Sequence, residues 1–193
     1  MSMSYETLKP GERYASGDGP VEDENLQSAL LNHVCLNISE PKRSLDFYKS
    51  VLGFSSLFSW NIGPQTVFFL GHRKAATSQE DFLKGMQGSA GLLELLWMHD
   101  AQPDAGAVTP PPRVGFFHIG ITVDSVSDIA RKAREFGSTI IKEPGPVQDE
   151  TKLGLPAGTP SVDASCHKIL SKVAYIADPD GNWIELVPRN IHA

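Results

Sequence analysis

An internal repeat constrains the fold of this chain more than any other feature of its sequence. Each half opens with an alternating strand pattern that carries a histidine, then continues with a helical pattern that ends at a glycine, over residues 33–53 and 118–137. Each half closes with an apolar strand pattern that carries one glutamate, Glu94 in the sequence LEL and Glu185 in the sequence IEL. The repeat predicts two similar modules, each with one histidine on its first strand and one glutamate on its last.

The first predicted module covers residues 29–98. Its opening stretch alternates apolar and polar residues, so that His33, Cys35 and Asn37 share the polar face of a strand. Ser39 is the expected N-cap of the helix that follows. The predicted elements are a strand at 31–38, a helix from 39 to a stop at 53, strands at 55–60, 65–70 and 91–97, and a polar loop at 72–91 with one short helical turn at 80–86.

The second predicted module covers residues 114–193. Its predicted elements are a strand at 117–123, a helix capped by Asp124 or Ser125 that stops at Gly137, and strands at 138–142, 172–177 and 182–187. Residues 143–167 are rich in proline and glycine and too long for an ordinary connection between strands. We interpret this segment as an insertion or lid.

Two segments outside the modules are predicted to be flexible. Residues 1–28 form a leader that lacks the apolar core of a signal peptide, and residues 99–113 form a linker rich in Pro, Gly and Ala. No stretch approaches the roughly 18 apolar residues of a membrane span. The net charge of −6 gives no basic footprint for nucleic acid or an anionic membrane. We expect a cytoplasmic protein that binds neither.

The cysteine count points away from thiol chemistry. The chain has two cysteines, too few for a disulfide framework or for a metal site built from thiolates. Cys35 lies in an apolar strand pattern, where a cysteine is more often a small buried hydrophobe than a catalytic thiol. We therefore expect reduced thiols and no catalytic role for Cys35.

The four repeated residues His33, Glu94, His118 and Glu185 predict a metal site. An unpaired carboxylate among apolar strand residues is costly, so Glu185 requires a partner. A single histidine or glutamate in such a strand is more often a hydrogen-bonded structural residue than a ligand, but two matched pairs favour ligands. Two imidazoles and two carboxylates suit one divalent metal that keeps positions open for water or substrate.

Several motifs, taken as a set, resemble one known family. They are HVCL from His33, SLDFY from Ser44, VLGF from Val51, LEL at Glu94, GFFHIGI around His118 and DPDGNWIE from Asp178. Over about residues 30–188 the chain is similar to glyoxalase I of the vicinal oxygen chelate superfamily. The resemblance implies an α+β fold of two tandem βαβββ modules whose cupped mixed sheets surround a metal. It assigns the four ligands, by motif, to the two histidines and two glutamates of the repeat.

The resemblance also implies an activity. It is that of a carbon–sulfur lyase that converts the hemithioacetal of glutathione and methylglyoxal to S-lactoylglutathione, a step of methylglyoxal detoxification. A divalent metal, zinc or nickel with iron, cobalt or manganese as alternatives, would polarise the two vicinal oxygens. A carboxylate would remove the C1 proton, and the metal-bound enediolate would be reprotonated at C2. Glu185 is the expected base and Glu94 its counterpart, and the candidate substrate-binding residues are Asn37, Arg113 and Trp183.

By the same resemblance we expect a homodimer in which His33 and Glu94 of one subunit meet His118 and Glu185 of the other. Two alternative functions stay open. Asn37 stands where glutathione-binding members carry arginine, which favours a vicinal oxygen chelate lyase, isomerase or cyclase acting on a specialised metabolite without glutathione. A non-catalytic module that sequesters a ligand is the further alternative. An iron extradiol dioxygenase is disfavoured, because such sites use two histidines and one carboxylate.

Overall fold

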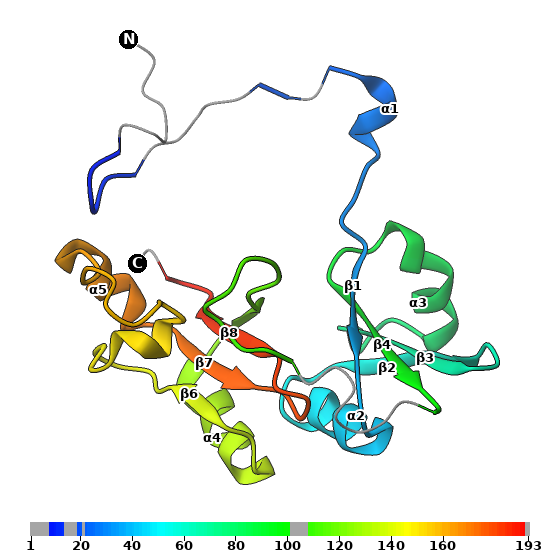
Figure 1. Ribbon diagram of the computed structural model, residues 1–193. Helices are drawn as coiled ribbons and strands as arrows, with labels where there is room; N and C mark the ends of the chain where they lie inside the picture. The colour runs from blue at the N-terminus through cyan, green and yellow to red at the C-terminus, as the bar shows by residue number, and fades with distance from the viewer. Residues whose placement is uncertain (1–7, 14–18, 21, 101–107, 192–193) are drawn as a thin grey trace.

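The computed structural model describes residues 8–13, 19–20, 22–100 and 108–191 (Figure 1). The leader and linker expected from the sequence lie partly outside these described residues. The described part of the leader contains one short helix, α1 (Glu24–Gln27), whose N-cap Asp23 accepts a hydrogen bond from the amide of Asn25. No helix in the described ranges is long and apolar enough to cross a membrane.

The first module is a four-stranded mixed sheet with a helix after its first strand. Its elements are β1 (His33–Asn37), α2 (Pro41–Ser50), β2 (Ser55–Asn61), β3 (Gln65–Gly71), α3 (Gln79–Gly85), the 3-10 helix η2 (Met86–Gly88) and β4 (Leu92–Met98). The strand order is β1-β4-β3-β2. β1 runs parallel to β4, and the other two pairings are antiparallel.

The second module repeats this topology. Its elements are β5 (Ile119–Val123), α4 (Val126–Phe136), β6 (Ile140–Lys142), the 3-10 helix η3 (Glu150–Leu153), α5 (Ala164–Leu170), β7 (Ala174–Ala177) and β8 (Trp183–Pro188). The strand order is β5-β8-β7-β6, with β5 parallel to β8 and the other pairings antiparallel. The predicted α+β fold of two tandem βαβββ modules is confirmed.

The pairing register explains why the histidine and the glutamate of each module meet. In the first module, Cys35 of β1 is the Cα partner of Glu94 in β4. In the second module, Gly120 of β5 is the Cα partner of Glu185 in β8. Each histidine lies two residues before that partner and so shares its side of the sheet. We call this side of each sheet, which carries the predicted ligands, the metal face, and the opposite side the core face.

The helix caps agree with the sequence predictions for α4 and differ from them for α2. Ser125 caps α4 as expected, and Gly137 ends that helix in the left-handed region with a φ of 90°. The expected N-cap of α2, Ser39, is wrong, because Glu40 caps this helix through a carboxylate that accepts from two amides of the first turn. A carboxylate suits that position, since it also faces the positive end of the helix dipole.

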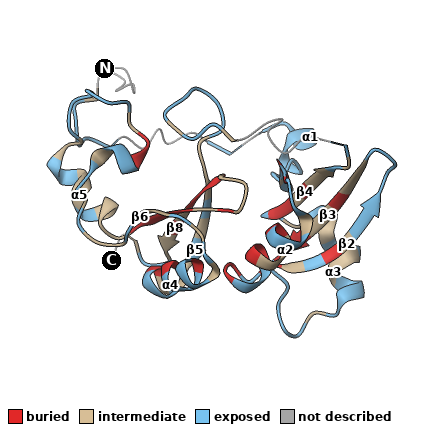
Figure 2. Ribbon diagram, turned by 60° about the horizontal axis from the view of Figure 1, so that its bottom comes forward, coloured by how far each residue is buried: buried red, intermediate tan, exposed pale blue. Residues whose placement is uncertain are grey.

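The two modules pack against each other through their core faces. One continuous cluster of buried side chains draws on β1, α2 and β4 of the first module and on α4, β7 and β8 of the second. Buried segments accordingly lie along α2, α4 and the sheets (Figure 2). At the contact, the rings of Phe47 and Phe136 meet edge to face with centroids 5.6 Å apart. The modules therefore share one core.

The tight turn before β8 docks onto α2 of the first module. The hydroxyl of Tyr48 donates to Asp178 Oδ2 at 2.7 Å, and the hydroxyl of Ser44 donates to Asp180 Oδ2 at 2.8 Å. Ser39, released from capping, donates through its hydroxyl to Asp180 Oδ1 at 2.6 Å. Both aspartates of the DPDG motif thus bind the two modules together.

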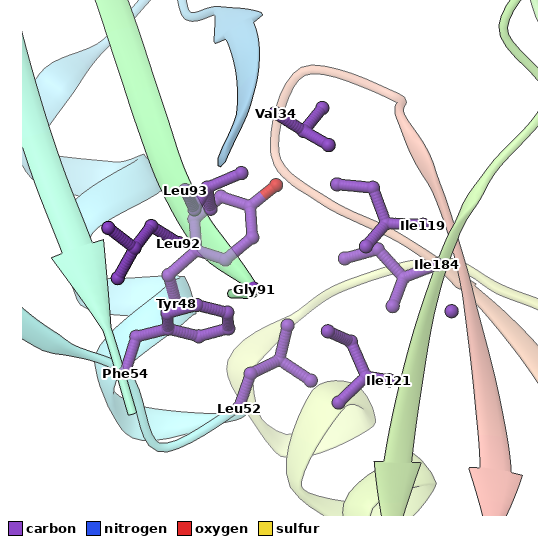
Figure 3. Close-up of a pocket in the computed structure, with 11 residues that line it drawn as sticks. Val34, Tyr48, Leu52, Phe54, Gly91, Leu92, Leu93, Ile119, Ile121 and Ile184 are labelled. Carbon is purple, nitrogen blue, oxygen red and sulfur yellow. The ribbon is translucent and has the colours of Figure 1, made fainter. Parts of the chain in front are cut away.

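A cavity of about 100 Å³ lies between the modules (Figure 3). Its lining is mainly apolar and comes from both modules, for example Val34 and Leu93 from the first and Ile119 and Ile184 from the second. In β1, β4 and β8 these side chains alternate with the histidine and glutamates of the repeat. The cavity is therefore lined from the core faces of the two sheets. It is a packing gap on the side of each sheet opposite the histidine and the glutamate.

Candidate metal centre

In the first module, His33 and Glu94 lie side by side on the metal face. His33 Nε2 is 3.1 Å from Glu94 Oε2, and the two side chains are 38% and 18% exposed. The histidine is the first residue of β1 and the glutamate lies within the neighbouring β4. Strands hold such side chains in fixed positions, which suits a preorganised site.

The hydrogen-bond partner of the second ring nitrogen of His33 determines which ring nitrogen carries the proton. Its Nδ1 is 2.9 Å from Oδ1 of Asn32, whose Nδ2 donates to the carbonyls of Met86 and Ser89. These two bonds fix the amide orientation, so an accepting oxygen faces Nδ1 and Nδ1 carries the proton. In the neutral ring, the Nε2 lone pair then faces a carboxylate oxygen. A cation held by both atoms would satisfy this arrangement, and the residues fit a divalent metal.

The second module presents a closely similar pair. His118 Nε2 is 3.2 Å from Glu185 Oε2, and these side chains are 25% and 20% exposed. His118 lies one residue before β5, one position outside the strand predicted for it. Its Nδ1 is buried and has no hydrogen-bond partner among the described residues. Each module therefore offers one imidazole nitrogen and one carboxylate oxygen that converge.

An aromatic ring stands beside each histidine at matched positions. Phe69 of β3 is the Cα partner of Glu94, and its ring meets His33 edge on with centroids 5.2 Å apart. Tyr175 of β7 is the partner of Glu185, and its ring meets His118 at 5.6 Å. The repeat thus extends beyond the ligand candidates to their neighbours in the adjacent antiparallel strand.

Two further side chains contact the glutamates. The hydroxyl of Tyr175 donates to Glu185 Oε1 at 3.1 Å. Burial, followed by the charge of Glu185, raises the pKa of Tyr175 above its ordinary value, so the phenol stays protonated. Partial desolvation of the thiol beside the sheet and then the charge of Glu94 raise the pKa of Cys35 to about 11, which keeps the thiol neutral. Cys35 itself is exposed on the metal face, so its expected burial as a small hydrophobe is wrong.

Neither histidine–glutamate pair lies at the contact between the modules. Their modules contact each other through the core faces, so the metal faces are directed away from that contact. Within the part of the chain that the structure describes, no group of three or more His, Cys, Asp or Glu side chains is placed to hold one ion. One chain therefore presents two half-sets of ligand candidates.

The three candidate substrate-binding residues lie in different surroundings. Asn37 is exposed and shares a face of β1 with His33. Trp183 is buried, and its ring lies 5.9 Å from Phe117 and 5.7 Å from Tyr175 between centroids. Arg113 is exposed in the loop before β5, where its Nε donates to the carbonyl of Thr109 at 2.7 Å.

The expected insertion at 143–167 covers part of the second module's metal face. It contains η3 and the start of α5, and Leu153 packs in a buried cluster with Val173, Tyr175 and Trp183. Gly154 has a φ of 73°, and a Cβ there would lie 2.6 Å from the ring of Phe117, so glycine is required. Within the insertion, His167 Nε2 is 3.6 Å from Glu150 Oε1.

The sequence analysis missed Phe69, Tyr175 and Phe117 as neighbours of the ligand candidates. One signal could have found Tyr175. The tight turn at 178–181 sets the antiparallel register of β7 and β8, and counting outward from it pairs Tyr175 with Glu185. The same count fails for Phe69, because the connection between β3 and β4 is long and contains two helices.

Comparison with known proteins agrees with this geometry. The model of the Glyoxalase/Bleomycin resistance protein/Dioxygenase superfamily matches residues 30–186. A lactoylglutathione lyase of Pseudomonas aeruginosa is 26% identical over 181 residues, a match that covers 88% of each chain. The trypanothione-dependent glyoxalase I of Leishmania major has a similar fold, with a TM-score of 0.53 at 22% identity, covering 86% of this chain and 90% of that one. Glyoxalase I of Zea mays gives a TM-score of 0.55 at 22% identity, covering 83% of this chain and 44% of the longer Zea mays chain.

The fold and the paired histidines and glutamates define a protein of two tandem βαβββ modules with nitrogen and oxygen ligand candidates on their metal faces. The chain belongs to the Glyoxalase/Bleomycin resistance protein/Dioxygenase superfamily. Its resemblance to glyoxalase I, drawn from the sequence motifs, is confirmed at the level of family and fold.

Proposed function

We propose that this protein is a divalent-metal-dependent lyase of the glyoxalase I type, which converts the hemithioacetal of glutathione and methylglyoxal to S-lactoylglutathione. The observation that carries the proposal is the pair of matched histidine–glutamate contacts, 3.1 Å in the first module and 3.2 Å in the second. The similarity to a lactoylglutathione lyase over most of the chain supports it.

Four residues would hold the metal, His33, Glu94, His118 and Glu185. Zinc or nickel is the preferred ion, with iron, cobalt or manganese as alternatives. When bound, the metal supplies a Lewis acid that stabilises negative charge developing on the substrate oxygens. Glu185 acts as the base that takes the proton from C1, and a proton is returned at C2, so the step is an isomerisation in which all atoms are retained. Glu94 occupies the matching place on the other side of the site.

The surroundings of the pairs suit a substrate with both apolar and polar parts. The rings of Phe117, Tyr175 and Trp183 form an apolar wall beside His118. Asn37 offers an amide on the metal face of the first module. Arg113 would supply a cation for a glutathione carboxylate once it exchanges its bond to Thr109.

We further propose that the working unit is a homodimer. The metal faces of one chain are directed away from the contact between its modules, so a complete ligand set requires a second copy. His33 and Glu94 of one subunit then meet His118 and Glu185 of the other, and each dimer has two equivalent sites.

The activity is tested with purified protein reconstituted with zinc or nickel and given methylglyoxal and glutathione. We expect metal-dependent formation of the thioester, followed by its ultraviolet absorbance and abolished by a chelator. The Glu185→Gln variant should form the thioester far more slowly than the wild type does. Absence of thioester from the reconstituted wild type would exclude the glutathione-dependent reaction.

A second candidate function is a proton-transfer reaction of the same superfamily on a specialised metabolite without glutathione. The observation that favours it is the uncharged Asn37 on the metal face of β1. Metal-loaded protein incubated in D₂O with small α-hydroxycarbonyl compounds should then exchange the proton next to the carbonyl, as seen by NMR. If the protein binds metal stoichiometrically but shows neither proton exchange nor thioester formation, the remaining candidate is the module that sequesters a ligand without catalysis.

A further inference from the structure

Both oxygens of Glu185 are engaged, and from different strands. Oε2 lies 3.2 Å from His118 Nε2, next to β5. Oε1 accepts a hydrogen bond of 3.1 Å from the hydroxyl of Tyr175 in β7. A carboxylate held at both oxygens has its orientation fixed, because rotation about the bond to its Cγ methylene would break one contact or the other.

Glu94 lacks the same support, although its module has the same framework. Phe69 occupies the position that corresponds to Tyr175, opposite the glutamate in the adjacent antiparallel strand and edge on to the histidine. A phenyl ring has no donor, so nothing on that strand holds Glu94. On its other side, Glu94 faces the thiol of Cys35, a weak donor, where the second module has Gly120.

The packing around Tyr175 holds its hydroxyl in place. The side chain is 5% exposed and lies in the buried cluster that includes Leu153 of the insertion. Its ring also contacts Trp183, with centroids 5.7 Å apart. The insertion therefore supports Glu185 indirectly, through the ring whose hydroxyl binds the carboxylate.

We propose that Tyr175 is a positioning residue that fixes the carboxylate of Glu185 and thereby makes the two glutamates of the site unequal. This rests on the proposed function, in which Glu185 is both ligand and base. A base held in one orientation meets the substrate proton at a defined geometry, whereas Glu94, held by a histidine and a thiol, keeps more freedom. Groups that orient metal ligands in this way typically change metal affinity or activity by about 10- to 100-fold when removed.

The test is the Tyr175→Phe variant, which removes one oxygen atom and converts the position to its counterpart in the first module. Cobalt affinity is measured by competition with a chromogenic chelator, and kcat and KM are measured on the reconstituted protein. We expect cobalt affinity and kcat each to fall about tenfold, with KM within twofold of wild type. A loss confined to kcat and metal affinity distinguishes positioning from a general loss of structure.

The matched control is Tyr48→Phe, which removes another buried hydroxyl, the donor to Asp178 at the contact between the modules. It should lower the melting temperature and leave cobalt affinity and kcat unchanged. The reciprocal variant Phe69→Tyr adds a phenol beside Glu94 and should raise cobalt affinity severalfold. It keeps the inference testable if Tyr175→Phe does not fold.

Wild-type cobalt affinity and kcat in Tyr175→Phe would overturn the inference, as would equal losses in Tyr48→Phe. If Tyr175→Phe does not fold, unchanged cobalt affinity in Phe69→Tyr would overturn it. If the wild-type protein forms no thioester, the proposed reaction fails, and the cobalt measurement alone decides the role of Tyr175. The two failures are therefore distinguishable.

Discussion

The two modules carry the same pair of ligand candidates in different surroundings. Each pairs a histidine with a glutamate at nearly equal distance, 3.1 Å in the first and 3.2 Å in the second. In the first module the long connection lies between β3 and β4, and the tight turn before β3 leaves Trp60 and Ile62 exposed. In the second module the long connection lies between β6 and β7, and the tight turn before β8 docks on α2.

This difference shows which part of a repeat is free to change. Strand order and register place the histidine and glutamate, and they are the same in both modules. The connections decide what covers the metal face, and they differ. Glu185 lies beside a phenol whose ring packs against the insertion, while Glu94 lies beside a thiol and a phenyl ring. The same pair of residue types therefore stands in two different environments.

The largest expected effect comes from removing each carboxylate in turn. Under the proposed function, Glu185→Gln should lower kcat/KM by about a thousandfold, because the change removes the proposed general base as well as a proposed ligand charge. Glu94→Gln removes a ligand charge only, and its loss should be about tenfold smaller. Steady-state kinetics on metal-reconstituted variants measures both values. A larger loss in Glu94→Gln would reverse the roles assigned to the two modules.

Mixing two inactive variants tests whether the modules of different subunits complete one site. One variant carries His33→Ala and Glu94→Gln, and the other carries His118→Ala and Glu185→Gln. After mixing, unfolding and refolding together, random pairing of subunits gives half heterodimers with one intact site of two, so activity should recover to about a quarter of wild type. Each variant refolded alone is the control. No recovery in heterodimers isolated with two affinity tags would place the site within one chain.

Truncation of equivalent core residues compares the stability of the modules. Leu95 and Leu186 each follow a ligand candidate and are fully buried, at 0% exposure. Leu95→Ala and Leu186→Ala should each lower the free energy of unfolding by about 3 kcal/mol, because each leaves a cavity in the shared core. Guanidinium titration followed by tryptophan fluorescence and circular dichroism should show one transition for both. Two separate transitions, with only one moved by each change, would show that the modules fold independently.

The smallest expected effect concerns Asp178, which lies in the docked turn of the second module. Burial raises its pKa above the ordinary value of 3.8, despite hydrogen bonds that act in the opposite direction. The folded state therefore binds this proton more tightly than the unfolded state. The stabilising contribution of that proton is complete below pH 3.8 and is lost as the pH rises through the folded pKa.

This dependence is measured by guanidinium unfolding of wild type and Asp178→Asn across the acid range. The free energy of unfolding of the wild type, relative to that of the variant, should fall as the pH rises from below 4 toward neutrality. A difference that stays constant with pH would mean that Asp178 titrates alike in the folded and unfolded chain. Asp46→Asn serves as a control for charge removal, because this half-exposed carboxylate of α2 pairs with Lys42 and not with the docked turn.

Much of the framework was predictable because it depends on local periodicity. Alternation located the strands to within about two residues and placed His33, Cys35 and Asn37 on one face, as the structure does. Two details were wrong for reasons that local patterns do not contain. Ser39 yields the cap of α2 to Glu40 because its hydroxyl binds Asp180, 141 residues away. Cys35 is exposed because its side of β1 is the metal face.

The candidate ligands followed from the repeat, but their neighbours did not. The repeat singled out His33, Glu94, His118 and Glu185, and the structure brings them together as two pairs. Their assignment to one metal in a dimer remains a prediction. Only strand register identifies Tyr175 and Phe69 as neighbours of the glutamates, since each lies on the strand adjacent to its glutamate.

The sequence by itself determined two βαβββ modules and the position of one histidine and one glutamate in each. It could do so because side-chain alternation and helix signals act over a few residues. Only the tertiary structure decided that the modules share a core, that their metal faces turn away from it, and that the phenol of Tyr175 holds Glu185 while the ring of Phe69 offers Glu94 no donor. These outcomes depend on packing and register between segments far apart in the chain, which local periodicity does not encode.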